Sequence, residues 1–228
     1  MATPPQFLVR DVETVDGDGL FIISTFDAAL PFLDSIGSHE QWGSTPFSHQ
    51  QSWVEDTLRQ IRDAENYNLT ANSKGERLHV FIVERQCPAQ GAEVLGAHYR
   101  IAVDGRRFLS VGFAFVRDNW FPSYITSQRH LHIGDAEPGN IVYLEVMVTD
   151  SRVGSLRCGA GAALIRAVHN YSRNRGKDAL YLDGWAGNEK KLIKYYDQQG
   201  FRVVDDFYLP RPHRTPWWGT LMRMDISE

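Results

Sequence analysis

Several features that would place a chain in a particular class are scarce or absent in this sequence. Only two of its 228 residues are cysteines, Cys87 and Cys158, and they form neither a metal-binding spacing nor a disulfide framework. No apolar run reaches the length of about 20 residues that a transmembrane helix needs. Residues 1–5 lack the basic-then-apolar layout of a signal peptide. The sequence thus predicts a cytoplasmic protein with no membrane partner and no bound metal.

Positive charge and phosphate-binding lysine motifs are scarce as well. The chain has 24 Lys and Arg residues against 28 Asp and Glu, a formal net charge of −4, which excludes a general nucleic-acid binder. It contains no Gly-Lys-Ser or Gly-Lys-Thr, so it has no P-loop. Apolar residues, by contrast, make up 43% of the chain, enough for a full core. Length and composition together predict one α/β domain over residues 1–228.

The stretch 141–161 has the pattern of a ligand-binding turn. Residues 141–148 are mostly β-branched or apolar, which indicates a strand. Gly159 and Gly161 follow a polar stretch and open a segment with apolar residues at helical spacing, which ends at Gly176. The free N–H groups and the dipole at a helix N-terminus attract anions, and glycine lets a phosphate come close to the backbone. The pattern predicts that a nucleotide-like diphosphate binds at this turn.

Shorter patterns predict the elements around this stretch. Asp27 is the expected N-cap of a helix that runs to about Ile36, and Ser48-x-x-Gln51 is a capping-box start for a second helix. A third expected helix covers residues 189–199. The expected strands cover 7–10, 78–83, 92–103, 108–115, 179–182, 201–206 and 220–226, with 87–91 as a hairpin turn. Residues 118–140 are long, irregular and aromatic, which favours a functional segment.

Two ligands compete for the glycine turn. In a dinucleotide-binding fold, Gly159-Ala160-Gly161 would cradle the pyrophosphate and Asp183 would bind a ribose. Three observations weaken this interpretation. Leu164 replaces the third glycine, the loop between the strand and Gly159 is long, and the chain before it is mostly antiparallel. Coenzyme A is the second ligand.

Two motifs resemble those of the GCN5-related N-acetyltransferase (GNAT) superfamily. Residues 143–148 followed by 158–164 resemble its acetyl-CoA motif. Residues 180–188 and 195–201 resemble its second motif, in which an Asn, a Tyr and a closing Gly-Phe recur at this spacing. The whole chain is similar to bacterial members with a Gly-Ser-x-x-Gln-Trp loop, here residues 37–42. The resemblance implies a mixed, mostly antiparallel central sheet with helices on both faces.

The resemblance also implies the parts of this fold. Residues 141–204 would form the acetyl-CoA core, and residues 118–140 an insertion on the acceptor side. The sequence departs from the superfamily at Leu156, three residues before the first glycine, where Arg or Gln is usual. Arg157 or Arg152 could supply the missing charge. The backbone amides would bind a diphosphate in either case.

The implied activity is transfer of an acetyl group from acetyl-CoA to an amine of a small molecule, by direct attack on the thioester. A protein or peptide amine is an alternative acceptor, and a non-catalytic acyl-CoA-binding module is an alternative function. Tyr196 would protonate the departing thiolate, and Glu145 would act as a base, with His130 and His132 as other candidates. A backbone N–H of Val146 or Val148 would donate to the thioester oxygen.

The residues expected to contact the two ligands follow from the same resemblance. Those on the coenzyme A side are Val146, Met147, Val148, Arg157, Cys158, Gly159, Ala160, Gly161, Ala162, Asn188 and Tyr195. Those on the acceptor side are Trp42, Trp120 and Phe121. Two of these assignments have a structural alternative, because Asn188 could cap the following helix and the three acceptor-side rings could be ordinary core. The sequence leaves open the identity of the acceptor and the oligomeric state.

Overall fold

The computed structural model describes residues 7–70, 77–88, 93–133, 139–211 and 214–226. In chain order its elements are β1 (Phe7–Asp11), η1 (Thr14–Asp16), α1 (Asp18–Ser35), η2 (Phe47–His49), α2 (Gln51–Thr70), β2 (Arg77–Cys87), β3 (Tyr99–Ile101), β4 (Arg107–Asp118), α3 (Ser123–Thr126), η3 (Arg129–Leu131), β5 (Ile141–Thr149), η4 (Ser151–Arg157), α4 (Ala160–Asn174), β6 (Ala179–Trp185), α5 (Gly187–Gln198), β7 (Arg202–Arg211) and β8 (Arg214–Asp225), where η marks a short 3₁₀ turn. None of the helices within these ranges is long and apolar enough to cross a membrane.

The strands form one mixed sheet in the order β1-β2-β4-β5-β6-β8-β7, with β3 paired to β4. Among the described pairs only β5 and β6 run parallel, so the sheet is mostly antiparallel, as predicted. The parallel pairing joins Ile141–Leu144 to Ala179–Leu182 and then stops. Beyond Leu144 the edge of β5 that faces β6 has no strand partner among the described residues. The two central strands therefore separate in the middle of the sheet.

A β-bulge lies at the point where these strands separate. In the pairing of β4 with β5, Phe115 lies opposite Val146 and Val116 opposite Leu144, so Glu145 is the extra residue. A bulge breaks the alternation of side chains and places two successive residues on one face of the sheet. Leu144 and Met147 accordingly pack on one face, and Val146 packs on the other.

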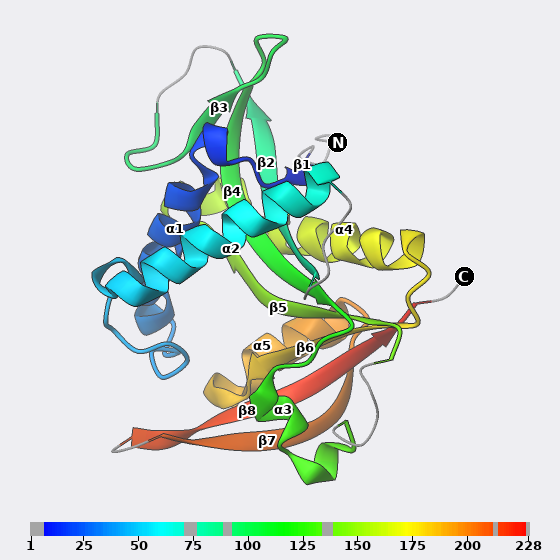
Figure 1. Ribbon diagram of the computed structural model, residues 1–228. Coiled ribbons are helices and arrows are strands. Elements are labelled where there is room, and N and C mark those ends of the chain that lie inside the picture. Colours follow the sequence, from blue (N-terminus) through cyan, green and yellow to red (C-terminus); the bar gives the residue numbers. More distant parts are fainter. Residues whose placement is uncertain (1–6, 71–76, 89–92, 134–138, 212–213, 227–228) are drawn as a thin grey trace.

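The two faces of the sheet are covered by different helices (Figure 1). On one face, α4 and α5 pack against all the central strands, around Leu164, Val168 and Ile193. On the other face, α1 and α2 cover the strands from the first half of the chain. Residues 120–133 cover the strands from the second half on that same face, through buried Ile125 and Leu131. On this face the cluster under α1 and α2 and the cluster under residues 120–133 are separate. We call the boundary between α1 and residues 120–133, beside the separated strands, the seam.

Three expected elements differ from the structure. Ser48 is not the N-cap of the second helix, because it lies in η2 and α2 begins only at Gln51. The first helix begins at Asp18, nine residues before Asp27, and its N-cap is Gly17. Asp27 lies inside this helix and its Oδ1 accepts hydrogen bonds from the N–H groups of Phe47 and Ser48, at 2.7 and 3.2 Å. Asp27 was predicted as an N-cap because caps favour Asp; here it caps a different turn, one that is distant in sequence.

The hairpin predicted at residues 87–91 is also wrong. Residues 89–92 lie outside the described residues, and only Tyr99–Ile101 of the expected strand 92–103 is a strand. This strand pairs with β4, with Tyr99 opposite Leu109, and not with β2. The hairpin is therefore formed by β3 and β4 around Gly105, whose φ of 79° suits glycine.

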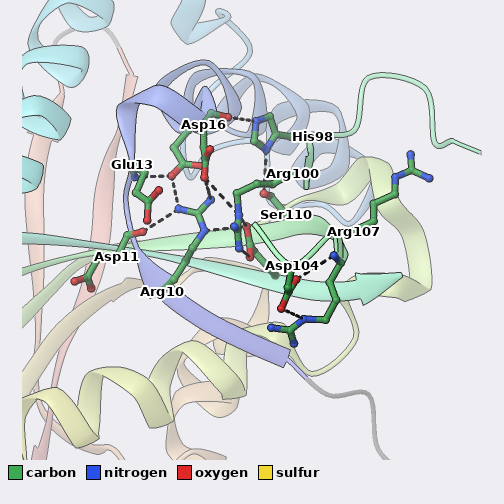
Figure 2. A network of polar contacts seen from close by, with 12 residues as sticks. Arg10, Asp11, Glu13, Asp16, His98, Arg100, Asp104, Arg107 and Ser110 are labelled. Carbon is green, nitrogen blue, oxygen red and sulfur yellow. Dashed lines mark hydrogen bonds and ion pairs between the residues drawn. The ribbon is translucent and has the colours of Figure 1, made fainter. Parts of the chain in front are cut away.

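A buried charged network fixes the start of α1 to the sheet (Figure 2). Glu84 and Asp18 are fully buried. Arg10 donates to both, and Arg100 donates to Glu84 at 2.9 and 2.7 Å. Burial alone would raise the pKa of Glu84, but the two guanidinium groups outweigh it and lower that pKa. The network anchors one end of α1, whose other end forms a wall of the cavity described next.

Candidate functional site

A cavity of about 740 Å³ lies against the open edge of β5. Its walls come from the C-terminal half of α1, from β5, from the turn before α4 and from α5. Eight of the residues expected on the coenzyme A side line it: Met147, Val148, Arg157, Cys158, Gly159, Gly161, Asn188 and Tyr195. Val146 lines a second cavity instead, and Ala160 and Ala162 line neither. The structure thus brings most of the predicted set together around one hollow, which we call the first cavity.

The glycine turn forms one end of the first cavity. Gly159 is the N-cap of α4, with a φ of 90°, a conformation that residues with a side chain rarely adopt. Among the described residues no side chain caps this helix end, so the N–H groups of its first turn are available for an anion. A Cβ built on Gly161 would lie 2.5 Å from Oη of Tyr195. Gly161 therefore makes room for Tyr195, whereas Gly159 is required by the backbone of the turn.

Cations stand at the rim of the first cavity. Arg157 donates from Nη1 to Oγ1 of Thr149 at 2.9 Å, and its guanidinium lies 4.4 Å from the ring centre of Phe32. Lys191 lines the same cavity. Arg152, by contrast, is paired with Asp150 at 2.8 Å and does not line it. Of the two arginines that could replace the side chain missing at Leu156, only Arg157 faces this site.

The alternation of N–H groups along β5 decides which of them faces the open edge. The N–H of Asp150, the residue after β5, donates to the carbonyl of Val111 in β4, at 2.9 Å. In an antiparallel pair, every second residue directs its N–H to the same neighbour, so Val148 and Val146 also point toward β4. The N–H of Met147 points to the open edge. The N–H groups of Val146 and Val148, which were expected at the open edge, point to β4 instead, because the bulge at Glu145 shifts the alternation.

A second cavity of about 480 Å³ meets the first. The residues common to the two linings are Gln41, Trp42, Met147, Trp185, Leu192 and Tyr196. The second cavity continues along the seam, toward Phe47, Tyr124, Trp217 and Arg211. It is also lined by two carboxylates, Glu145 and Asp183. A molecule in either cavity would touch the shared residues at the junction.

The two carboxylates of the second cavity have different partners. Glu145 is paired with Arg117 at 2.6 Å, and Arg117 also donates to Gln60 and lies over the ring of Trp120. Asp183 accepts hydrogen bonds from the hydroxyl groups of Tyr124, at 3.0 Å, and Tyr143. Burial raises the pKa of Asp183, and the charge of Glu145 raises it further, against the effect of the two hydroxyl groups. The environments of the two carboxyl groups thus differ strongly.

Tyr196 stands where the two cavities meet. It lies on α5 with a side chain that is only 6% exposed, and its ring packs against Tyr195 and Phe201. Within the described part of the chain its hydroxyl has no hydrogen-bond partner. Burial raises its pKa above the ordinary value, so the hydroxyl keeps its proton at neutral pH. Tyr196 is therefore a protonated donor that a bound molecule can reach.

Asn188 does not cap a helix in this structure. Its Nδ2 donates to the carbonyl of Ile36, at 2.7 Å, and to Oγ of Ser38, at 2.8 Å. Asn188, Glu189 and Lys190 all have a positive φ, which is uncommon in residues other than glycine. The irregular start of α5 thereby holds the loop that follows α1.

The loop of residues 37–43 covers the junction of the cavities. Besides Asn188, Nε1 of Trp217 donates to the carbonyl of Gln41 and Nη1 of Arg211 to that of Glu40, each at 3.1 Å. Gln41 and Trp42 of this loop line both cavities. Trp42 was among the residues expected on the acceptor side, but sequence reasoning missed Gln41, although the Gly-Ser-x-x-Gln-Trp pattern was visible. The pattern alone gave no distance to β5 or α5.

The aromatic residues expected on the acceptor side divide into two groups. Trp42 lines both cavities, but Trp120 and Phe121 line neither. Their rings pack against Tyr143, at 5.7 and 5.5 Å between centroids. Tyr124 is the member of this segment that reaches the second cavity. His130 and His132 are absent from both linings, and Nε2 of His130 bonds the carbonyl of Asp206 instead.

The dinucleotide interpretation is wrong. It requires a doubly wound parallel sheet, whereas this sheet is mixed and mostly antiparallel. It also requires Asp183 to reach the ligand of the glycine turn. Asp183 lies in the second cavity, and Gly159 and Gly161 lie in the first.

No family model and no curated protein sequence matches the chain. Solved structures share its fold over nearly the whole length. One is yncA from Salmonella typhimurium, proposed to be an acetyltransferase and solved with its cofactor acetyl-CoA. It is 14% identical, with 97% of this chain and 95% of that chain covered and a TM-score of 0.57.

Two further structures show the same likeness. A protein from Desulfovibrio desulfuricans, proposed to be an acetyltransferase of the GNAT family, is 12% identical, covers 97% of this chain and 100% of its own, and has a TM-score of 0.54. Spermidine/spermine N-acetyltransferase SpeG from Vibrio cholerae is 16% identical, with 97% and 94% covered and a TM-score of 0.52. At these identities the likeness establishes the fold, which is the GNAT-like fold that the motifs predicted.

Proposed function

We propose that this protein is a cytoplasmic N-acetyltransferase that moves the acetyl group of acetyl-CoA to an amine of a small molecule. The observation that carries the proposal is the junction of two cavities at Tyr196, beside the gap between β5 and β6. One cavity begins at an uncapped helix N-terminus and the other ends at carboxylates and aromatic rings. The solved structure from Salmonella with the same fold holds acetyl-CoA.

The first cavity fits coenzyme A in its chemistry. The first-turn N–H groups of α4, with Arg157 and Lys191 nearby, suit a diphosphate. The open edge of β5 offers unpaired N–H and C=O groups to the amides of the pantetheine arm, as an added strand would. Phe32, Leu33 and Leu192 supply an apolar wall. When bound, acetyl-CoA would supply an activated acyl group as a thioester.

The residues at the junction can assist each part of the transfer. The N–H of Met147 is directed to the open edge, where it can donate to the thioester oxygen as negative charge grows there. Tyr196 places a hydroxyl that is protonated at neutral pH at the junction, where it can give its proton to the departing sulfur. Glu145 can act as a base only by weakening its ion pair with Arg117. It is the negative wall of the acceptor side in this proposal.

The acceptor is proposed to be a small molecule because the second cavity is compact and has walls on several sides. Its volume of about 480 Å³ falls in the usual range of small-ligand sites. The segment 118–140 contributes Tyr124, and the β7–β8 pair contributes Trp217 and Arg211. These contacts support the assignment of residues 118–133 to the acceptor side; residues 134–138 lie outside the described residues.

The proposal is tested by incubating the protein with acetyl-CoA and a panel of amines while free thiol is measured. We expect amine-dependent thiol release with compact alkylamines and little release with peptides that carry a free N-terminus or lysine. A higher kcat/KM for peptides than for alkylamines would indicate that the acceptor is a protein or peptide amine. Tight binding of acetyl-CoA in calorimetry, with no thiol release in the presence of any amine, would indicate a non-catalytic acyl-CoA-binding module.

A further inference from the structure

We propose that Asp183 binds the ammonium group of the acceptor and then takes a proton from it, so that the acceptors are alkylamines that are cationic in solution. This inference rests on the proposed acetyl transfer and adds the chemical class of the acceptor and the identity of the base. It replaces Glu145, the base expected from its position among the buried valines of the central strand, by a residue on the neighbouring strand.

The first argument is the lack of charge compensation at Asp183. Its hydrogen-bond partners are the neutral hydroxyl groups of Tyr124 and Tyr143. Among the described residues no Lys, Arg or His side chain forms an ion pair with it. Glu145, by contrast, already has Arg117 at 2.6 Å. A partly buried carboxylate without a cation is a favourable partner for a ligand that brings one.

The second argument is the character of the surrounding wall. Trp42, Phe47, Tyr124 and Trp217 line the cavity that Asp183 lines. Aromatic faces attract cations through the negative potential of the ring. Carboxylates and aromatic rings around one compact space therefore favour an alkylammonium group over a neutral or anionic acceptor. Arg211 is the one cation among the described residues of this lining, and its guanidinium donates to the carbonyls of Glu40 and Thr215.

The third argument concerns the proton. An ammonium ion has no lone pair, so it must lose a proton before it can attack. The titratable groups that face Asp183 are Tyr143 and Glu145 on β5, Tyr124 on α3 and Tyr196 on α5, while Arg117 is engaged by Glu145. Burial raises the pKa of Asp183 above its ordinary value, which makes it a stronger base than a solvated carboxylate.

The resulting step balances as follows. Asp183 accepts the first proton of the ammonium group and later releases it to solvent. The lone pair of the amine forms a bond with the acyl carbon, and the carbon–sulfur bond breaks. Tyr196 gives its proton to the sulfur and regains one from the acylated nitrogen. The products are an acetamide and free coenzyme A thiol.

The test compares Asp183→Asn with Glu145→Gln, since each replaces a carboxylate by an amide of similar shape. Thiol release from acetyl-CoA is measured with benzylamine, which is cationic at neutral pH, and with aniline, which is neutral. Wild type should prefer benzylamine, and its kcat/KM should fall at acidic pH as the base is protonated. Asp183→Asn should lower kcat/KM by on the order of 10²-fold or more and remove the acidic limb. Glu145→Gln should keep that limb.

Tyr124→Phe provides a second variant that needs no change at Asp183. It removes one hydrogen bond to the charged carboxylate, so the acidic limb should move to higher pH. Thermal melting checks that each variant is folded. Asp183→Asn with wild-type kcat/KM and an intact acidic limb would overturn the inference, as would equal use of aniline and benzylamine.

Binding separates this inference from the proposed function. Calorimetry of benzylamine with the coenzyme A complex of wild type and of Asp183→Asn needs no turnover. Loss of benzylamine binding in the variant supports ammonium recognition by Asp183 even if wild type releases no thiol. Equal binding to both proteins contradicts it, whether or not acetyl transfer is found.

Discussion

The two cavities that meet at Tyr196 are built in different ways. The first is formed by three stretches of chain, 29–42, 147–161 and 185–196. Much of what it offers a ligand is backbone: an uncapped helix end and an open strand edge. The second is formed by side chains from the loop after α1, from β5, β6 and α3, and from the β7–β8 pair. A backbone site tolerates many sequences, whereas a side-chain site changes with each residue. In the proposed function, this difference separates a cofactor side that depends mostly on the backbone from an acceptor side that depends on side chains.

A substitution in the glycine turn is expected to have the largest effect on the first cavity. Gly161→Asp should weaken coenzyme A binding by roughly 10²-fold or more, equivalent to about 3 kcal/mol. The new Cβ would displace Tyr195, 2.5 Å away, and the carboxylate would occupy the anion site. Calorimetry on the folded variant measures the loss. Gly139→Asp adds the same charge at a glycine with no atom within 4 Å of the new Cβ, and it should bind coenzyme A normally. An unchanged Kd in Gly161→Asp would show that the diphosphate does not bind at this turn.

Tyr196→Phe tests the point where the cavities join. The change keeps the ring and its packing but removes the hydroxyl, so kcat should fall by on the order of 10²-fold. The affinity for coenzyme A and the thermal stability should hardly change, because the proton is given in the transition state. Tyr195→Phe is the matched control, since Tyr195 lines the first cavity alone. Near-normal kcat in Tyr196→Phe, with chemistry shown to be rate-limiting, would reduce Tyr196 to a packing residue.

Trp217→Ala should separate the two cavities functionally. It removes a wall of the second cavity and the hydrogen bond to the carbonyl of Gln41, so the KM of the acceptor should rise about tenfold, or about 1.4 kcal/mol. The affinity for coenzyme A should stay the same. Trp218→Ala changes the next residue, which is 54% exposed and lines neither cavity, and it should be silent. A loss of coenzyme A affinity in Trp217→Ala alone would show that the second cavity is not an acceptor site.

A pair of changes at Asn188 should give the smallest effects and sharpen the role of the loop of residues 37–43. Asn188→Gly removes the hydrogen bonds to Ile36 and Ser38 but suits the positive φ, so it should lower the free energy of unfolding by about 1 kcal/mol. Asn188→Ala also strains the backbone and should lose about 1 kcal/mol more. Urea unfolding measures both. Asn188→Gly with wild-type stability and wild-type KM values would show that the loop does not depend on these hydrogen bonds.

The same difference between the cavities explains what could be predicted from the sequence. The strand, the glycine turn and the helix of the first cavity are contiguous, so local patterns could group Gly159, Arg157 and Tyr195, and the structure places all three around one cavity. Trp120 and Phe121 were predicted to contact the acceptor, but they lie in an irregular segment without periodicity. Nothing in that segment indicated that Tyr124 would face the cavity instead.

Two finer features depend on tertiary contacts that no local pattern shows. The bulge at Glu145 arises from the pairing of β5 with β4, so the predicted alternation gave the wrong N–H groups at the open edge. Asp183 was noted only as a possible ribose ligand, because its tyrosine partners lie 40 and 59 residues away in the chain. Asp27 was assigned to the wrong helix boundary for a similar reason, since the groups it caps are 20 residues further on.

A crystal structure with bound coenzyme A tests the central claim most directly, because that claim is a meeting point. The diphosphate should contact the first-turn N–H groups of α4, and the pantetheine arm should follow the open edge of β5. The sulfur should then lie at the junction, beside the hydroxyl of Tyr196 and facing the cavity that holds Asp183. A sulfur that points to solvent or away from Tyr196, or a diphosphate bound elsewhere, would contradict the account.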